Sequence, residues 1–132
     1  MKVIDYLKNA KVFYAATTDG EQPHVRPIGF VMDYEGQLAF YTDTRKNMFK
    51  QMKANPKMEF CALDGKMNTL RLTGEAKFIT TPESKKAALE AMPMLAKAGY
   101  SVEDDVFEIY TLENISLSYA NMAGKQLDGI EL

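Results

Sequence analysis

The chain has 132 residues, of which 16 are basic and 18 acidic, so its net charge is −2. That length predicts a single domain over residues 1–132 with one core, and the near-neutral charge argues against nucleic acid or a membrane as a partner. The lone cysteine excludes an internal disulfide, and no apolar run is long enough for a signal peptide or a transmembrane helix, so we expect a cytoplasmic protein.

The first part of the chain predicts one helix and two strands. Residues 2–9 have apolar side chains clustered on one side of a helix. Residues 12–18 are rich in β-forming side chains and end at Asp19-Gly20, a typical hairpin turn. Residues 24–34 alternate between two faces, as a strand does. Pro27 cannot donate a hydrogen bond within a sheet, so we expect it at an edge, at a bulge or at the mouth of a strand.

Residues 37–56 indicate a binding site. A strand over 37–42 ends at a polar cluster, and an amphipathic helix over 46–54 follows it. This order places two hydroxyls and two cations beside the first unpaired N–H groups of a helix, which is a suitable site for a phosphate. Arg26 adds a further cation, because its strand should pair with 37–42 through a tight turn. A phosphate bound there would hold a flat cofactor against the sheet.

The second half of the chain predicts three more strands and two helices. The strands span 57–63, 68–80 and 106–119. Threonine, proline and acid at 81–83 are a typical helix start, and a second short helix is expected within 94–105. Tight turns between most strands require antiparallel pairing. The expected fold is therefore mainly β, a six-stranded antiparallel Greek-key barrel with peripheral helices.

Three segments, in this order, resemble the FMN-binding split-barrel family that includes pyridoxamine 5'-phosphate oxidase: AATTDGEQPHVRPIGF, GQLAFYTDTRKNMFKQMKANPKMEF and TLRLTGEAKF. The resemblance implies a split barrel that forms an obligate homodimer, with two FMN molecules in clefts between the protomers. It also implies a flavin-dependent oxidoreductase that acts on an unknown small substrate, with an electron donor such as NADH or NADPH.

The resemblance implies three groups of cofactor-binding residues. The first group holds the FMN phosphate and comprises Arg26, Thr42, Lys46 and Asn47, with Arg45 as a further candidate. The second group lies along the isoalloxazine ring and comprises Pro27, Ile28, Tyr41 and Asp43. The third group approaches the flavin of the partner protomer and comprises Asn68, Thr69 and Arg71. No catalytic residue and no metal ligand is identified.

Plainer interpretations of these residues stay open. Thr42 could cap the helix that follows it, and Arg71 could pair with Glu75 or Asp64. The only histidine, His24, has no acid or nucleophile identifiable beside it, so we do not expect it to be catalytic.

The chain also departs from the family pattern. Its tail, NMAGKQLDGIEL, lacks the arginine and histidine that hold the pyridoxal substrate in pyridoxamine 5'-phosphate oxidase, so that activity is not expected. Nitroimidazole-reductase relatives commonly have a histidine where this chain has Tyr41. The alternative function is a non-catalytic flavin or haem carrier of the same fold. An oligonucleotide-binding barrel is disfavoured by the acidic balance.

Overall fold

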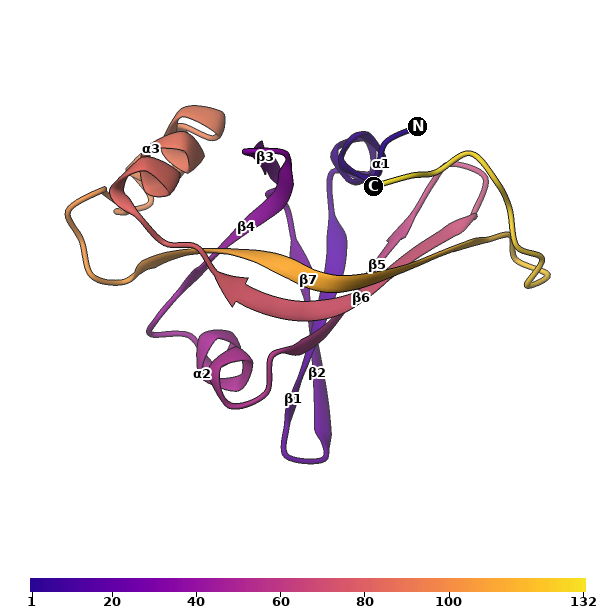
Figure 1. Cartoon of the computed structure of the whole chain (residues 1–132), viewed down its shortest axis with the longest axis horizontal. Coiled ribbons are helices and arrows are strands. Elements are labelled where there is room, and N and C mark those ends of the chain that lie inside the picture. Colours follow the sequence, from indigo (N-terminus) through magenta and orange to yellow (C-terminus); the bar gives the residue numbers. More distant parts are fainter.

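Alternating apolar and polar side chains place seven segments of the chain in one antiparallel sheet, with four helices around it (Figure 1). The computed structural model describes residues 1–132. Its strands are β1 (Phe13–Asp19), β2 (Gln22–Ile28), β3 (Met32–Tyr34), β4 (Gln37–Asp43), β5 (Lys57–Leu63), β6 (Thr69–Phe78) and β7 (Phe107–Ala120). Its helices are α1 (Val3–Ala10), α2 (Asn47–Ala54), α3 (Pro82–Ala91) and α4 (Met94–Lys97). The mainly β, antiparallel class predicted from the sequence is confirmed.

The sheet curls on itself, because strands that are distant in its order share one core. The order is β2-β1-β5-β6-β7-β4-β3, so three strands separate β1 from β4. Phe13 on β1 nevertheless packs edge-on against Phe40 on β4, with ring centroids 6.2 Å apart. In Figure 1, β1 and β2 accordingly cross β6 and β7 at a steep angle. The strands β2 and β3 remain as the two edges, and Pro27 lies on the edge strand β2.

The segment 24–34, predicted as one strand, forms parts of two, so the sheet has one strand more than the six expected. β2 ends at Ile28, and β3 begins at Met32. Between them, the neighbouring residues Phe30 and Val31 are both buried, and they pack into different clusters of the core. β2 pairs with β1 and β3 pairs with β4, at opposite ends of the sheet order, so the chain leaves the strand conformation here to pass from one edge of the sheet to the other.

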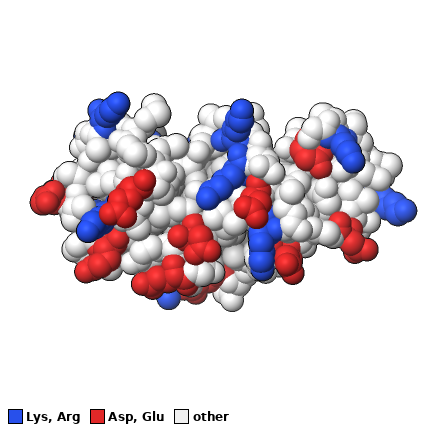
Figure 2. Space-filling view, turned by 90° about the horizontal axis from the view of Figure 1, so that it is seen from above, with Lys and Arg blue, Asp and Glu red and all other residues white.

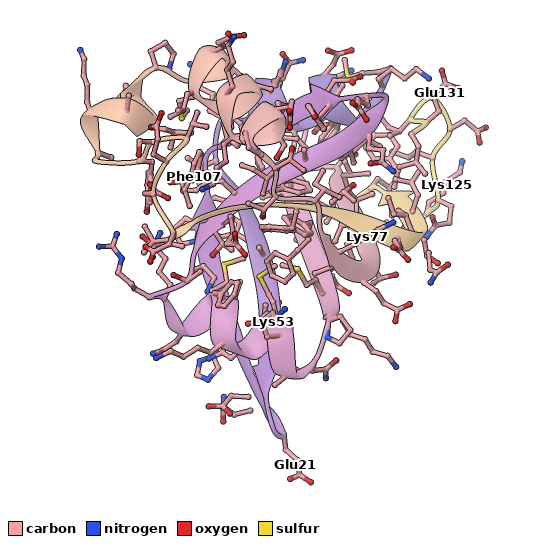
Figure 3. The ribbon with its side chains drawn as sticks, turned by 60° about the vertical axis from the view of Figure 1, so that its left-hand side comes forward. Glu21, Lys53, Lys77, Phe107, Lys125 and Glu131 are labelled. Carbon is pink, nitrogen blue, oxygen red and sulfur yellow. The ribbon has the colours of Figure 1, made fainter.

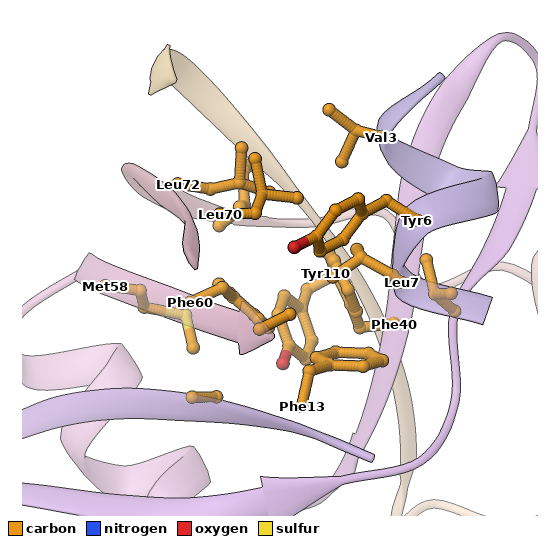
Figure 4. Packing of buried hydrophobic residues seen from close by; sticks show 14 of the residues in the cluster. Val3, Tyr6, Leu7, Phe13, Phe40, Met58, Phe60, Leu70, Leu72 and Tyr110 are labelled. Carbon is orange, nitrogen blue, oxygen red and sulfur yellow. The ribbon is translucent and has the colours of Figure 1, made fainter. Parts of the chain in front are cut away.

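Aromatic rings fill the interior of the barrel (Figure 4). The ring of Phe40 stacks on those of Phe60 and Tyr110, at centroid distances of 4.6 Å and 5.4 Å. Helix α2 contributes Met48 and Met52 to the same cluster, so these residues form its packing face, as expected for an amphipathic helix. Burial of this face fixes α2 directly after the end of β4.

A smaller apolar cluster lies against α3 and α4 and includes Phe30, Met32, Ala39, Ala88, Leu95, Phe107 and Ile109. Helix α3 begins with a capping box: Oγ1 of Thr81 accepts from the N–H of Ser84 at 3.0 Å, and Oγ of Ser84 accepts from the N–H of Thr81 at 2.9 Å. The helix begins at Pro82, within the predicted start, and ends at Ala91, and α4 is the second short helix expected after it.

The surface carries both signs of charge. On the face shown in Figure 2, cations and carboxylates are interspersed rather than gathered into one large field. None of the helices combines the length and the apolar character that crossing a bilayer requires.

Candidate functional site

A cleft of about 310 Å³ lies between the end of β2, the end of β4 and the start of α2. Three separate segments supply its lining: Arg26, Pro27, Ile28, Gly29, Tyr41, Thr42, Lys46, Asn47 and Met48. All of these except Gly29 and Met48 belong to the cofactor-binding set predicted from the sequence. The curvature of the sheet brings the edge strand β2 close to the β4–α2 turn, although the two strands do not pair.

The first turn of α2 faces this cleft without a cap from the protein. Lys46 occupies the N-cap position with an extended backbone, no side chain accepts from the first N–H groups, and the first turn has no acid. These N–H groups lack intrahelical partners and carry the positive end of the helix dipole. The start of α2 therefore offers hydrogen-bond donors and positive potential to an anion.

Thr42 does not cap α2, so that plainer interpretation is wrong. Its side chain is buried, and its Oγ1 has no hydrogen-bond partner in the protein. A buried hydroxyl without a partner is uncommon, because leaving it unsatisfied costs about 1 to 3 kcal/mol. Thr42 lines the cleft, so an anion bound at α2 could accept this hydrogen bond. The residues present therefore fit a phosphate.

Arg26 is held in position by a buried network rather than lying free on the surface. Its Nη1 donates to Oγ1 of Thr17 at 2.6 Å, and its Nη2 donates to Oε1 of Gln51 at 3.1 Å. Thr17 in turn donates to the same Gln51 oxygen at 2.6 Å. Burial lowers the pKa of the Arg26 guanidinium from its usual value, but arginine remains charged in proteins. The network presents a fixed cation at the cleft.

Sequence reasoning missed Thr17 and Gln51. Each carried a signal: Thr17 lies on the same strand face as the buried Phe13 and Ala15, and Gln51 lies beside Met52 on the buried side of α2. A polar side chain at an apolar position needs a buried partner, and Arg26 is that partner for both.

Asp43 and Arg45, two predicted cofactor residues, do not line the cleft. The Asp43 side chain is buried and accepts from Nε of Arg45 at 3.0 Å, from Nη2 of Arg45 at 2.6 Å and from the hydroxyl of Tyr100 at 2.8 Å. The Arg45 side chain, followed by its backbone N–H and Tyr100, holds the pKa of Asp43 well below its usual range, although burial acts the other way. The pair therefore fixes the turn between β4 and α2.

Tyr41 forms an aromatic wall of the cleft. Its ring packs against those of Phe30, Tyr100 and Phe107 at centroid distances between 5.7 and 5.8 Å, and Nζ of Lys46 lies 5.7 Å from its centre. Burial, and next the charge of Asp43, raise the pKa of Tyr41. Its phenol is therefore protonated at neutral pH and can donate a hydrogen bond into the cleft.

The third predicted group lies outside the cleft. Nδ2 of Asn68 donates to Asp64 at 3.2 Å, while Arg71 pairs with Glu59 at 2.8 Å. Arg71 thus pairs with neither Glu75 nor Asp64. The β5–β6 register explains the choice, because it sets Arg71 opposite Cys61, two residues from Glu59 on the same strand face. Thr69 likewise does not line the cleft.

The sequence model of the pyridoxamine 5'-phosphate oxidase family matches residues 2–112. A NimC/NimA family protein from Clostridium acetobutylicum has a similar solved structure, with 40% sequence identity and a TM-score of 0.86. That match covers 94% of this chain and 86% of the other. A search of curated proteins finds no match.

More distant structures share the fold alone. General stress protein 26 from Bacillus anthracis superposes with a TM-score of 0.74 at 13% identity, covering 95% of this chain and 94% of the other. A protein of the pyridoxine-phosphate oxidase family from Clostridium acetobutylicum, related to general stress protein 26, has a TM-score of 0.71 at 17% identity. It covers 94% of this chain and 88% of the other.

Proposed function

Because this chain belongs to the pyridoxamine 5'-phosphate oxidase family, we propose that it is an FMN-dependent oxidoreductase that acts on a small substrate. The observation that carries the proposal is the cleft at the start of α2, where Arg26, Thr42, Lys46 and Asn47 converge. All four of these side chains can donate to an anion, and the hydroxyl of Thr42 has no partner within the protein.

The phosphate site combines charge with fixed donors. Lys46 and Arg26 supply two cations, and the uncapped N–H groups of α2 add oriented hydrogen-bond donors. Thr17 and Gln51 already hold Arg26 in position, so little side-chain entropy is lost when a ligand binds. The chain therefore suits a ligand that carries a phosphate at one end.

The ring of the flavin would lie between the edge strand β2 and Tyr41. One side of the β2 backbone has no neighbouring strand, so its polar groups are available to the polar edge of the ring. The aromatic ring of Tyr41 lines the other side of the cleft. A bound flavin supplies the electron-transfer chemistry, and these residues supply its binding and orientation.

We also propose that the protein is a homodimer, because a large apolar area is exposed on the outer face of β1 and β2. Val25 on β2 and Tyr14 on β1 are exposed to 69% and 48%, and Val12, directly before β1, is exposed to 50%. Val25 pairs with Ala16, two residues from Tyr14 on β1, so Val25 and Tyr14 lie on the same face of the sheet. Tyr14 also pairs with Cys61 on β5, which in turn pairs with Arg71 on β6. A second copy packed on this face would cover these side chains. Asn68, Thr69 and Arg71 are then the residues proposed to approach the flavin of the partner.

The test is a spectrum and a titration of the purified protein. We expect flavin absorption bands after incubation with FMN, and bleaching by NADH or NADPH without oxygen. Lys46→Gln should raise the Kd for FMN about tenfold, because a charge-assisted contact is lost. Lys53→Gln, on the same helix but outside the cleft, is the matched control and should leave the Kd unchanged.

Other results of this test would favour a different function for the protein. FMN binding without bleaching by any reduced donor favours the flavin carrier over the enzyme. Red-brown protein with haem bands favours the haem carrier. Protein that binds no FMN at millimolar concentration contradicts the proposal.

A further inference from the structure

A second groove, of about 530 Å³, meets the cofactor cleft at Asn47. One wall is a single face of α2, formed by Asn47, Lys50, Gln51 and Ala54. The other wall is the β1–β2 hairpin together with Asn55, which lies between α2 and β5. The hairpin contributes Thr18, Asp19, Gly20 and His24 to this wall. Figure 3 shows this hairpin projecting beyond α2, with Glu21 at its tip. Asn47 is the only residue of this groove in the predicted cofactor set.

The position of the groove relates it to the phosphate end of the cleft. His24, Arg26 and Ile28 lie on the same face of β2, because side chains alternate along a strand. Arg26 and Ile28 line the cleft, and His24 lines the groove. The two depressions therefore follow one another along β2 and α2, and they meet where the phosphate is proposed to bind.

FMN ends at its phosphate, so an FMN molecule bound in the cleft would not extend into the groove. We infer that this groove accommodates the part of a flavin dinucleotide that lies beyond the first phosphate, so that the chain binds FAD as well as FMN. The inference rests on the proposed function, because it requires the first phosphate to lie at the start of α2. A volume of about 530 Å³ is within the range of small-molecule sites.

The side chains in the groove match the parts of such an extension. Lys50 lies one helical turn after Asn47 and supplies a cation for the second phosphate. Asp19 supplies a carboxylate, which can accept from the hydroxyls of a ribose. The ring of His24 is exposed and planar, so an adenine base can stack on it.

The less exposed polar side chains of the two walls, Thr18, Gln51 and Asn55, form the floor of the groove and are already hydrogen-bonded within the protein. Nδ2 of Asn55 donates to Oγ1 of Thr18 at 3.0 Å, and Gln51 accepts from Arg26 and Thr17. The side chains of Asp19, His24 and Lys50 are exposed and form none of the hydrogen bonds or ion pairs that hold the floor. The groove thus has a rigid base with polar groups available at its rim.

The experiment compares FMN and FAD on matched variants by calorimetric titration, with mass spectrometry of the bound ligand to exclude hydrolysis of FAD. We expect the wild-type protein to bind FAD at least as tightly as FMN. Lys50→Gln should raise the Kd for FAD about tenfold and change that for FMN less than about twofold. Asp19→Asn should weaken FAD alone, by a smaller factor.

Two controls separate this inference from the proposed function. Lys53→Gln alters the same helix outside the groove, where Nζ lies 5.1 Å from the centre of the Phe78 ring, and should affect neither flavin. Lys46→Gln should weaken both flavins equally, because both carry the first phosphate. Wild-type protein that binds FMN but rejects FAD overturns the inference and leaves the proposed function standing, as does an equal loss of both flavins in Lys50→Gln. Protein that binds neither flavin overturns both.

Discussion

The hydroxyl of Tyr100 donates a hydrogen bond of 2.8 Å to Oδ2 of Asp43, joining the segment after α4 to the last residue of β4. The same carboxylate is paired with Arg45 at 2.6 Å. Thr42 and Tyr41, which line the proposed flavin cleft, directly precede Asp43 in the chain. The bond therefore supports the geometry of the cleft from a segment that does not line it.

Removal of this hydrogen bond should destabilise the fold. Tyr100→Phe leaves the ring stacked on Phe107 but removes a donor to a buried carboxylate. Hydrogen bonds to charged groups contribute about 1.5 to 3 kcal/mol, so the free energy of unfolding in urea should fall by that amount. Tyr34→Phe is the control, because this partly buried tyrosine lies on β3 away from Asp43, and it should change the free energy little. Equal midpoints for Tyr100→Phe and wild type would contradict the role given to this bond.

Asp43 should also make stability depend on acid. Its pKa is lower in the folded protein than its usual 3.8, so its stabilisation is complete above that value and is lost as the pH falls towards the folded pKa. We expect the free energy of unfolding to decline below about pH 4. Asp43→Asn should be less stable at pH 7, and its deficit should shrink as the pH falls from about 4 to 2.

Two other carboxylates contribute to the decline of the free energy of unfolding at low pH. In Asp64 and Asp104, burial raises the pKa, but other contacts outweigh it and lower the pKa overall: backbone and side-chain hydrogen bonds in Asp64, and backbone hydrogen bonds with the charge of Lys85 in Asp104. The Asp43→Asn variant should therefore keep part of the wild-type decline. Parallel curves for variant and wild type, with a constant deficit at every pH, would refute the assignment to Asp43.

The hydroxyl of Thr42 has no hydrogen-bond partner, so its removal should not destabilise the fold but should weaken FMN binding. Thr42→Val replaces the hydroxyl by a methyl group of similar volume and removes an unsatisfied buried group. Without ligand, the variant should unfold at the same free energy or about 1 kcal/mol higher. Its Kd for FMN should rise about tenfold, because the phosphate loses one donor. Thr42→Ser retains the donor and should bind like wild type.

Thr17→Val provides the contrast, because that hydroxyl bonds both Arg26 and Gln51. It should lower the free energy of unfolding by about 1 to 3 kcal/mol. If Thr42→Val destabilises the free protein as much as Thr17→Val does, the hydroxyl of Thr42 has a partner after all.

The sequence predicted the local elements well because their signals are local. The strand over 57–63 has the predicted limits, and α2 begins within one residue of the predicted start. The division of 24–34 into β2 and β3 was not predictable, since alternation alone does not reveal that its two parts lie at opposite edges of the sheet, β2 beside β1 and β3 beside β4. Those positions follow from the pairing of β1 with β5 and of β4 with β7, segments that are distant in the sequence.

In the candidate site, too, the residues that one local segment brings together could be predicted, and those that depend on long-range contacts could not. Thr42, Lys46 and Asn47 lie within one strand–loop–helix segment, so their convergence follows from the order of elements. The partners of Arg26 come from β1 and α2, and no pattern within one segment specifies them. The pairing of Arg71 with Glu59 likewise depends on the β5–β6 register, over a sequence separation of 12 residues.

The proposed dimer makes the last prediction. Val25 is 69% exposed on the outer face of β2, where it lies beside Ala16 and near Tyr14. A stable interface needs a desolvated apolar centre, and a buried unpaired carboxylate there is strongly unfavourable. Val25→Asp should therefore convert the dimer to a monomer at micromolar concentration, as measured by light scattering, and should raise the Kd for FMN if the partner contributes to the cleft. Met94→Asp is the matched control, because Met94 is 70% exposed but lies on α4, outside this face. Wild-type protein that is monomeric with FMN bound would exclude the shared cleft, and dissociation by Met94→Asp as well as by Val25→Asp would place the interface elsewhere.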